Sequence, residues 1–315
     1  MENSSFRTRI KTNIATNKID YASKIILFGS CFSENIGEKF RYFKFDARTN
    51  PYGILFNPIA IETAINECVA KKTYTKEDLF FHNEQWHSYA HHSDFSATEP
   101  EIVLKKINDS IQETHQQLKS ATHIILTFGT AWVYEYLESK MTVANCHKVP
   151  QKEFKKKLLT IEEITQALQN IKKQVLDIHP EITIILTSSP VRHIKDGIVE
   201  NALSKAHLLA AIHSATDAQT SYFPSYEIVL DDLRDYRFYE KDMVHPNETA
   251  IDYIWSIFKR TWMASKTEKL QKEIDTIQKG LLHKPFNSSS KAHKLFKEQL
   301  ALKIKTLEED NHIIF

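Results

Sequence analysis

Short apolar runs alternate along the chain with longer segments that are apolar on one side. Runs at 25–28, 124–128 and 182–187 have the length of buried strands and are too short for helices. Apolar residues recur every three or four positions in the segments between them, as in amphipathic helices. The predicted helices span 33–42, 59–69, 100–120, 161–178, 200–214 and 248–263. A further short strand is predicted at 43–48, and a final short strand and turn at 221–225 and 227–230. In the helix at 200–214 we expect Leu203, Leu208, Leu209 and Ile212 to face inward.

Strands that alternate with helices predict a parallel sheet with helices on both of its faces. We therefore expect an α/β fold, a three-layer α/β/α sandwich. Ligands of such sheets bind beyond the carboxyl ends of the strands. The chain has 6 glycines, and Gly29 and Gly129 each directly follow a predicted strand, while Gly53 lies in the loop after another. Glycine allows a tight turn or a close approach to a ligand, so these loops are where we expect the site.

The composition changes after residue 264. Lys, Glu and Gln dominate the remaining residues, apolar positions become sparse, and residues 287–290 interrupt two helical halves. We expect a domain at 1–264 and a helical C-terminal extension at 265–315. The extension is expected to carry no chemistry of its own, and it either packs on the domain or mediates self-association.

Overall charge, apolar runs and cysteine content indicate which partners and which compartment to expect. Lys plus Arg number 41 against 40 for Asp plus Glu. A charge balance this close to zero does not favour nucleic acid or an anionic membrane as a partner. No apolar run approaches the roughly 20 residues that span a bilayer, and residues 1–24 lack the apolar centre of a signal peptide. Cys31, Cys68 and Cys146 are far apart and odd in number, which favours a reducing compartment. We expect a cytoplasmic globular protein.

The segment 80–96 is unusually rich in histidine and aromatic residues. A metal site is one interpretation, but the spacing matches no zinc pattern and no cysteine or paired carboxylate completes it. We therefore expect neither metal nor cofactor, and favour an aromatic loop that lines or covers a pocket. The residues concerned are His82, Trp86, His87, Tyr89, His91, His92 and Phe95.

Two short motifs carry candidate chemistry. The first predicted strand turns at Gly29 and delivers Ser30 and Cys31 to the start of a helix, where free N–H groups stabilise negative charge near a nucleophile. Asp242 precedes His245 by three residues in the loop that opens the last helix of the domain. At this spacing the carboxylate can orient the imidazole as a general base. The ordinary alternatives are a plain strand–helix turn, and a capping aspartate beside a surface histidine.

With these motifs the chain resembles the GSCFA branch of the SGNH or GDSL hydrolase superfamily, from about residue 5 to residue 263. The resemblance implies a mainly parallel, flavodoxin-like sheet. It also implies an enzyme that hydrolyses or transfers an acyl group, with a small-molecule or carbohydrate ester as substrate. The matching segments are Gly-Ser-Cys-Phe-Ser at 29–33, Asn-Pro-Tyr-Gly-Ile at 50–54, Gly-Thr-Ala-Trp-Val-Tyr-Glu at 129–135, Ser-Pro-Val-Arg-His at 189–193, and residues 236–246.

The resemblance also implies roles for individual residues. Cys31 falls at the nucleophile position, with Ser30 as the alternative, and Asp242 and His245 match the orienting acid and the base. A thiol beside an imidazole at a helix N-terminus is expected to have a lowered pKa. The backbone N–H groups of Cys31 and Gly53 would hold the oxyanion.

The third motif of the superfamily is incomplete in this chain. Gly129 is present, but Ala131 and Trp132 stand where the superfamily has Asn and Asp. Asn50 and Asn145 are the nearest replacements by residue type. Arg192 and His193 follow another strand and would suit an anionic or polar group of the substrate, or else lie in a surface loop.

The missing asparagine supports an alternative of another class. In it the chain is a catalytically altered module that keeps the fold and binds a glycan or acyl ligand. A nucleotide-binding protein is disfavoured, because the turn at Gly29 is neither a G-x-G-x-x-G sequence nor a P-loop.

Overall fold

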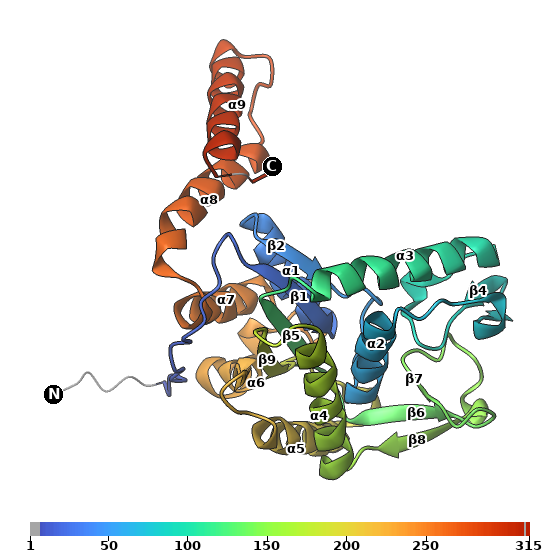
Figure 1. Ribbon diagram of the computed structural model, residues 1–315. Coiled ribbons are helices and arrows are strands. Elements are labelled where there is room, and N and C mark those ends of the chain that lie inside the picture. The colour runs from blue at the N-terminus through green and yellow to red at the C-terminus, as the bar shows by residue number, and fades with distance from the viewer. Residues whose placement is uncertain (1–6, 312) are drawn as a thin grey trace.

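The computed structural model describes residues 7–311 and 313–315 (Figure 1). Its centre is a sheet with the strand order β10-β9-β5-β1-β2, in which every neighbouring pair is parallel. Strand β1 lies between the central strand β5 and the edge strand β2. The strands are β1 (Lys24–Gly29), β2 (Asp46–Thr49), β5 (His123–Phe128), β9 (Thr183–Ser188) and β10 (Thr220–Tyr222).

Helices cover both faces of this sheet. Ile26 and Phe28 of β1 pack in the core shared with α2, α3, α4 and α5, whereas Ile25 and Leu27 pack in the opposite core with α1 and α7. All four side chains are at most 2% exposed, as expected of a strand that is buried on both sides. The predicted three-layer α/β/α sandwich is confirmed. Its helices are α1 (Cys31–Tyr42), α2 (Pro58–Ala70), α3 (Pro100–Leu118), α4 (Ile161–Ile178), α5 (Ile198–Ser214) and α7 (Glu248–Trp262).

The sequence explains where several helices begin. The side chain of Asn57 accepts a hydrogen bond from Ala60 N at 2.9 Å, and Pro58 occupies the first turn, where no N–H is needed. Thr160 and Glu163 form a reciprocal capping box at the start of α4. Helix α1 begins at Cys31, two residues earlier than predicted, because Ser30 caps it.

Two smaller β structures lie beside the sandwich. The segment after residue 131 forms an antiparallel sheet in the order β7-β6-β8, and the histidine-rich segment contains the β3–β4 hairpin. The ring of His91 is buried and stacks on Tyr52 with 4.2 Å between centroids. No group of three potential metal ligands occurs among the described residues. The strands are β3 (Phe80–His82), β4 (Gln85–His87), β6 (Trp132–Tyr136), β7 (Thr142–Val143) and β8 (Phe154–Leu158).

Helix α5 faces inward only in part as predicted. Leu208 and Ile212 are fully buried as expected, whereas Leu203 is 47% exposed, and the first half of the inward face carries Asn201, Ser204 and Lys205. These polar side chains hydrogen-bond to the loops at the ends of β5 and β9, and those bonds set the face that the helix presents.

The last predicted strand is shorter than expected. β10 ends at Tyr222, and the chain then forms the short helix α6 (Ser225–Glu227) and a π-helical turn at Ile228–Leu233. The hydroxyl of Ser225 donates to Ser188 O at 2.8 Å, which anchors the chain to β9 and starts the turn away from the sheet. The predicted final strand and turn are therefore present, and the turn is helical.

The ends of the domain meet at the end of α7. Ile19 N donates to Trp262 O at 2.7 Å, and Ala264 N donates back to Ile19 O at 2.9 Å. Residues 1–6, part of the segment that lacks the apolar centre of a signal peptide, lie outside the described residues.

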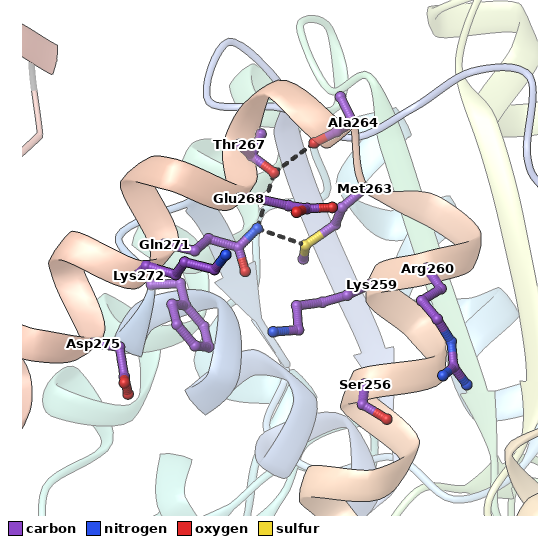
Figure 2. A pocket seen from close by; sticks show the side chains of 11 residues that line it. Ser256, Lys259, Arg260, Met263, Ala264, Thr267, Glu268, Gln271, Lys272 and Asp275 are labelled. Carbon is purple, nitrogen blue, oxygen red and sulfur yellow. Dashed lines mark hydrogen bonds between the residues drawn. The ribbon is translucent and has the colours of Figure 1, made fainter.

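The C-terminal extension forms α8 (Glu268–Leu282) and α9 (Lys291–Asn311), which project from the sandwich (Figure 1). Tyr42 of α1 donates to Asp275 at 2.9 Å and accepts from Gln278 at 3.0 Å, so α8 is docked on the domain. Figure 2 shows the pocket of about 410 Å³ at the junction of α7 and α8, lined in part by Lys259 and Gln271. The boundary at residue 264 and self-association through the extension stay predictions. No helix in the described part of the chain is long and apolar enough to cross a membrane.

Candidate active site

The turn after β1 requires glycine. Gly29 has a φ of +148°, and a Cβ at this position would lie 2.2 Å from Thr127 O on the neighbouring strand. Its N–H donates to Asn50 Oδ1 at 2.8 Å. The chain therefore leaves the sheet abruptly at its carboxyl edge, where the next residues can meet a ligand.

Ser30 and Cys31 have different surroundings. Ser30 is fully buried, and its hydroxyl oxygen accepts from Phe32 N at 3.3 Å as the N-cap of α1. Cys31 is the first residue of the helix and is partly exposed. The geometry thus favours Cys31 over Ser30 as nucleophile, and this assignment stays a prediction.

Burial raises the pKa of the Cys31 thiol above its usual value. The backbone N–H groups of Cys31 and Phe32 and the charge of Lys205 act in the opposite direction, while Asp242 adds to the increase. The lowered pKa expected from the sequence is therefore wrong, because desolvation outweighs the helix N-terminus. At neutral pH the free thiol keeps its proton and needs a base to remove it.

Asp242 and His245 make the contact that their spacing predicts. Asp242 Oδ2 lies 2.7 Å from His245 Nδ1, and Oδ1 accepts from Val244 N at 2.8 Å and His245 N at 3.0 Å. These bonds lower the pKa of Asp242 to about 2, so the carboxylate is ionised. It fixes the ring through Nδ1 and leaves Nε2 for proton transfer.

The loop that carries this pair is attached to the carboxyl edge of the sheet. Arg192 N, beyond the end of β9, donates to Val244 O at 3.2 Å, and Val244 packs in the same core as Cys31. No hydrogen bond joins the His245 ring to Cys31 within the described residues. Catalytic contacts are often loose before substrate binds, so this geometry is compatible with a nucleophile and its base.

A cavity of about 660 Å³ opens in front of His245. It brings together five of the residues predicted from the sequence: Asp242, His245, Arg192, His193 and Asn145. Further residues come from the small antiparallel sheet and from two other loops, and they include Trp132, Tyr134, Asn57, His92, Cys146 and Lys195. Cys31, Ser30, Asn50, Gly53 and Gly129 are not among the residues that line it.

The loop at 50–54 does not offer the oxyanion donor that was expected at Gly53. Gly53 N donates to Asn50 O at 2.7 Å, so this N–H is already engaged, contrary to the expected role in holding an oxyanion. The Asn50 side chain accepts from Gly29 and donates to Glu34 at 2.6 Å. Asn50 and Gly53 therefore shape the turn around Gly29, because the local chain closes on itself there.

Asn145 is better placed to replace the missing asparagine. Its Oδ1 accepts from His147 N at 2.9 Å, and no hydrogen bond is recorded for its amide NH₂ in the described part of the chain. Asn57 also lines the cavity, and its Oδ1 caps α2. Its NH₂ donates no hydrogen bond within the described residues, and nothing in the sequence indicated its position at the cavity.

Arg192 and His193 both line the cavity, and the surroundings of their side chains differ. The Arg192 guanidinium lies over the rings of Tyr239 and Tyr236, at 4.3 and 5.3 Å. Burial, followed by the charges of Lys205 and His245, lowers the pKa of His193 to about 3, so its ring is neutral. Neutral His193 cannot supply a positive charge to an anionic group.

Lys205 is a buried basic residue, bonded to the loops after β5 and β9, that sequence reasoning missed. It is 1% exposed, and its ammonium donates to Gly129 O at 2.7 Å and to Ser189 O at 2.6 Å. Burial lowers its pKa to about 7, and the attraction of Cys31 opposes that decrease. A lysine within an apolar helix pattern is expected at the surface, so the sequence gave no indication of this position.

Comparisons with solved structures find remote likenesses. One is a carbohydrate esterase family 3 protein from Talaromyces cellulolyticus, with 9% identity, a TM-score of 0.36, and 81% of this chain and 99% of that chain covered. Another is the acetyl xylan esterase Est2A from the rumen bacterium Butyrivibrio proteoclasticus, with 10% identity, a TM-score of 0.36, and 84% and 66% covered. No curated protein matches the chain.

Family models match most of the sequence. The GSCFA family matches residues 24–258, and the C-terminal domain of GSCFA domain proteins matches residues 274–313. The first match covers more than half of the chain and includes every candidate catalytic residue. The chain therefore belongs to the GSCFA family.

Proposed function

We propose that the protein hydrolyses or transfers the acyl group of an ester, with Cys31 as nucleophile, His245 as base and then acid, and Asp242 as the residue that orients the imidazole. The observation that carries this proposal is the 2.7 Å contact between Asp242 Oδ2 and His245 Nδ1 at the mouth of the cavity. That contact holds the ring with Nε2 available as a proton acceptor.

In the proposed reaction, His245 Nε2 takes the Cys31 proton as Sγ attacks the carbonyl carbon of the ester. The negative charge moves to the carbonyl oxygen. When the tetrahedral intermediate collapses, the bond to the leaving alcohol breaks, and the alcohol takes the proton from Nε2. The resulting thioester is then attacked by water or by an acceptor hydroxyl, whose proton passes to His245, and Cys31 leaves as the thiol. The raised pKa of the thiol makes the base necessary for the first step.

Two groups would stabilise the negative oxygen. The backbone N–H of Cys31 lies in the first turn of α1, where helix N–H groups have no partner within the helix. The Asn145 amide is the side-chain donor that we propose in place of the missing asparagine. Removing one such donor typically lowers the rate by about 10²–10³.

A carbohydrate ester is the substrate class that we propose. The cavity combines polar side chains with the aromatic rings of Trp132 and Tyr134, a lining that suits a polar ring compound. Lys195 lines the cavity and forms no ion pair with a carboxylate in the described residues, so it is available to an anionic group of the substrate.

Hydrolysis of p-nitrophenyl acetate and of an acetylated monosaccharide tests this function. We expect Cys31→Ala and His245→Ala to lose at least about 10² in kcat/KM, because nucleophile and base are both removed from the chemical step. Ser30→Ala is the matched control at the same turn and should keep most of the activity. Full activity in His245→Ala would refute the proposed pair.

The alternative is a binding module without turnover, and the observation in its favour is Ala131. This residue stands in place of the superfamily's asparagine and is fully buried. Under the alternative, iodoacetamide would not label Cys31 selectively, and an acetylated sugar would raise the melting temperature without being hydrolysed. Selective labelling together with turnover would exclude it.

A further inference from the structure

The hairpin of α8 and α9 has a small core of its own and an apolar groove at its surface. Ile274, Ile277 and Leu307 are buried in that core, and α9 stands clear of the sandwich (Figure 1). A groove of about 480 Å³ lies between the two helices, and Leu302 and Thr306 line it from α9. Leu302 is 66% exposed, so a single copy of the chain leaves this apolar surface open to solvent.

The outer side of α9 has the spacing of a coiled-coil seam. In such a seam, residues at intervals of three and four occupy the a and d positions of a heptad written abcdefg, with leucine favoured at d. Leucine fills the first two d positions of the series in α9, and all of its members are exposed. Starting from an a position, the series is Ala292, Leu295, Gln299, Leu302, Thr306 and Glu309. Because Leu302 and Thr306 belong to both seam and groove, a helix laid along the seam also covers the groove.

The charges beside the seam are complementary between two parallel copies of α9. In a parallel pair, each g position lies next to the following e position of the other helix. Glu298, at g, therefore meets Lys303 of the second copy, and Lys305, at the next g, meets Asp310 of the second copy. Both combinations unite opposite charges, and the two-fold symmetry of the pair forms each of them twice.

Within one chain these charges have few partners. Glu298, Lys303 and Asp310 form no ion pair in the part of the chain that the structure describes, and the exposed contact of Lys305 with a neighbouring carboxylate measures 3.9 Å. The a position at Gln299 also favours a parallel pair in register, because the two amides then face each other and can hydrogen-bond. In an antiparallel pair this amide would face a leucine and lack a partner.

We propose that α9 is a dimerisation helix, which pairs in parallel and in register with α9 of a second copy of this chain and so covers the groove beside α8. The seam carries only two leucines per copy, so the dimer dissociates on dilution. The inference does not depend on the proposed ester chemistry, because no residue of α9 lines the cavity in front of His245.

Sedimentation equilibrium of the full chain between about 1 and 100 µM tests whether this dimer forms. We expect the share of dimer to increase with concentration. Leu302→Glu should raise the dissociation constant by about 10² or more, because two carboxylates would be buried against each other in the seam. Leu203→Glu is the matched control, since Leu203 is an exposed leucine of α5, and it should dimerise like the wild type. A wild type that stays monomeric, or an undiminished dimer in Leu302→Glu, would overturn the proposal.

Exchange of charges tests which residues meet. Glu298→Lys gives two contacts between lysines in each dimer, and Lys303→Glu gives two contacts between glutamates. At low salt each single variant should raise the dissociation constant about tenfold, because two attractive contacts become repulsive. The double variant, and an equal mixture of the two single variants, should dimerise like the wild type. Single variants with unchanged dimerisation, or a double variant as weak as either of them, would contradict this pairing.

A cysteine at position 299 tests the parallel register. With oxidised glutathione as the oxidant, two facing thiols lose two protons and two electrons and form a disulfide between copies. Gln299→Cys should form it, because equivalent a positions face each other, whereas Lys297→Cys, on the outer side of α9, and the wild type should not. A disulfide that appears only when Gln299→Cys is mixed with Leu302→Cys would show an antiparallel pair and overturn the proposed arrangement.

Discussion

Replacement of His91 by phenylalanine should make the protein less sensitive to acid. His91 is fully buried and stacked on Tyr52, and its Nδ1 is bonded to Ser88 Oγ at 3.0 Å. Its Nε2 has no hydrogen-bond partner in the described part of the chain. Burial, with smaller contributions from Lys72 and His147, lowers the pKa of His91 from 6.5 to about 3.

The direction of this pH dependence follows from whether the folded or the unfolded protein binds the proton of His91. Below pH 6.5 the unfolded chain protonates His91, whereas the folded protein keeps the ring neutral until about pH 3. The stabilisation is therefore complete above the unfolded pKa and is lost as the pH falls toward the folded one. At about 1.36 kcal/mol per pH unit, the free energy of unfolding should fall by about 2.5 kcal/mol between pH 7 and pH 4.5 from this group alone.

Urea denaturation followed by tryptophan fluorescence at pH 7, 6, 5 and 4.5 measures this loss. The difference in free energy of unfolding between wild type and His91→Phe should shift in favour of the variant by about 2.5 kcal/mol over that range. Phe95→Leu is the matched control, because Phe95 packs against the same ring at 5.0 Å and does not titrate. It should lower stability by a similar amount at every pH. Parallel pH profiles for wild type and His91→Phe would refute the reasoning.

Four further outcomes are expected. Asp242→Asn should lower kcat by about 10²–10⁴, since the His245 ring loses the acceptor that orients it, while the melting temperature stays close to that of the wild type. Wild-type activity in this variant would argue against the proposed role of Asp242. Ser30→Ala should lower the free energy of unfolding by about 1 kcal/mol in urea titrations, because α1 loses its N-cap. If alkylation of Cys31 by iodoacetamide were lost as well, Ser30 would do more than cap the helix. Gly29→Ala should cost about 2 kcal/mol or more, because its φ is +148° and the new Cβ overlaps a backbone oxygen; near-normal melting would mean that the turn can relax. Tyr42→Phe should lower stability by about 1 kcal/mol through the lost bond to α8, with alkylation of Cys31 unchanged.

The sequence predicted those features that depend on short-range spacing. Apolar runs located β1, β5 and β9, and the three-residue spacing of Asp242 and His245 predicted their contact. Each depends on residues within about one turn of one another, where local geometry decides.

The features that it missed depend on what packs around a residue. The pKa of Cys31 depends on burial in the core shared with α7, which the helix N-terminus alone does not reveal. The burial of Lys205 could not be predicted, because it depends on the carbonyls of Gly129 and Ser189, which are far from it in the sequence. Gly53 matched a motif, yet its N–H is occupied by Asn50 within the same loop.

The pairing of residue 19 with the end of α7 has a consequence for synthesis. Ile19 exchanges backbone hydrogen bonds with Trp262 and Ala264, and its side chain is fully buried. During translation this early segment must wait until about 240 further residues have left the ribosome before it meets its partners. Strand β1 can pair with β2 and β5 long before then. The sheet can therefore assemble from its centre as the chain emerges, and α7 closes the domain as one of the last steps.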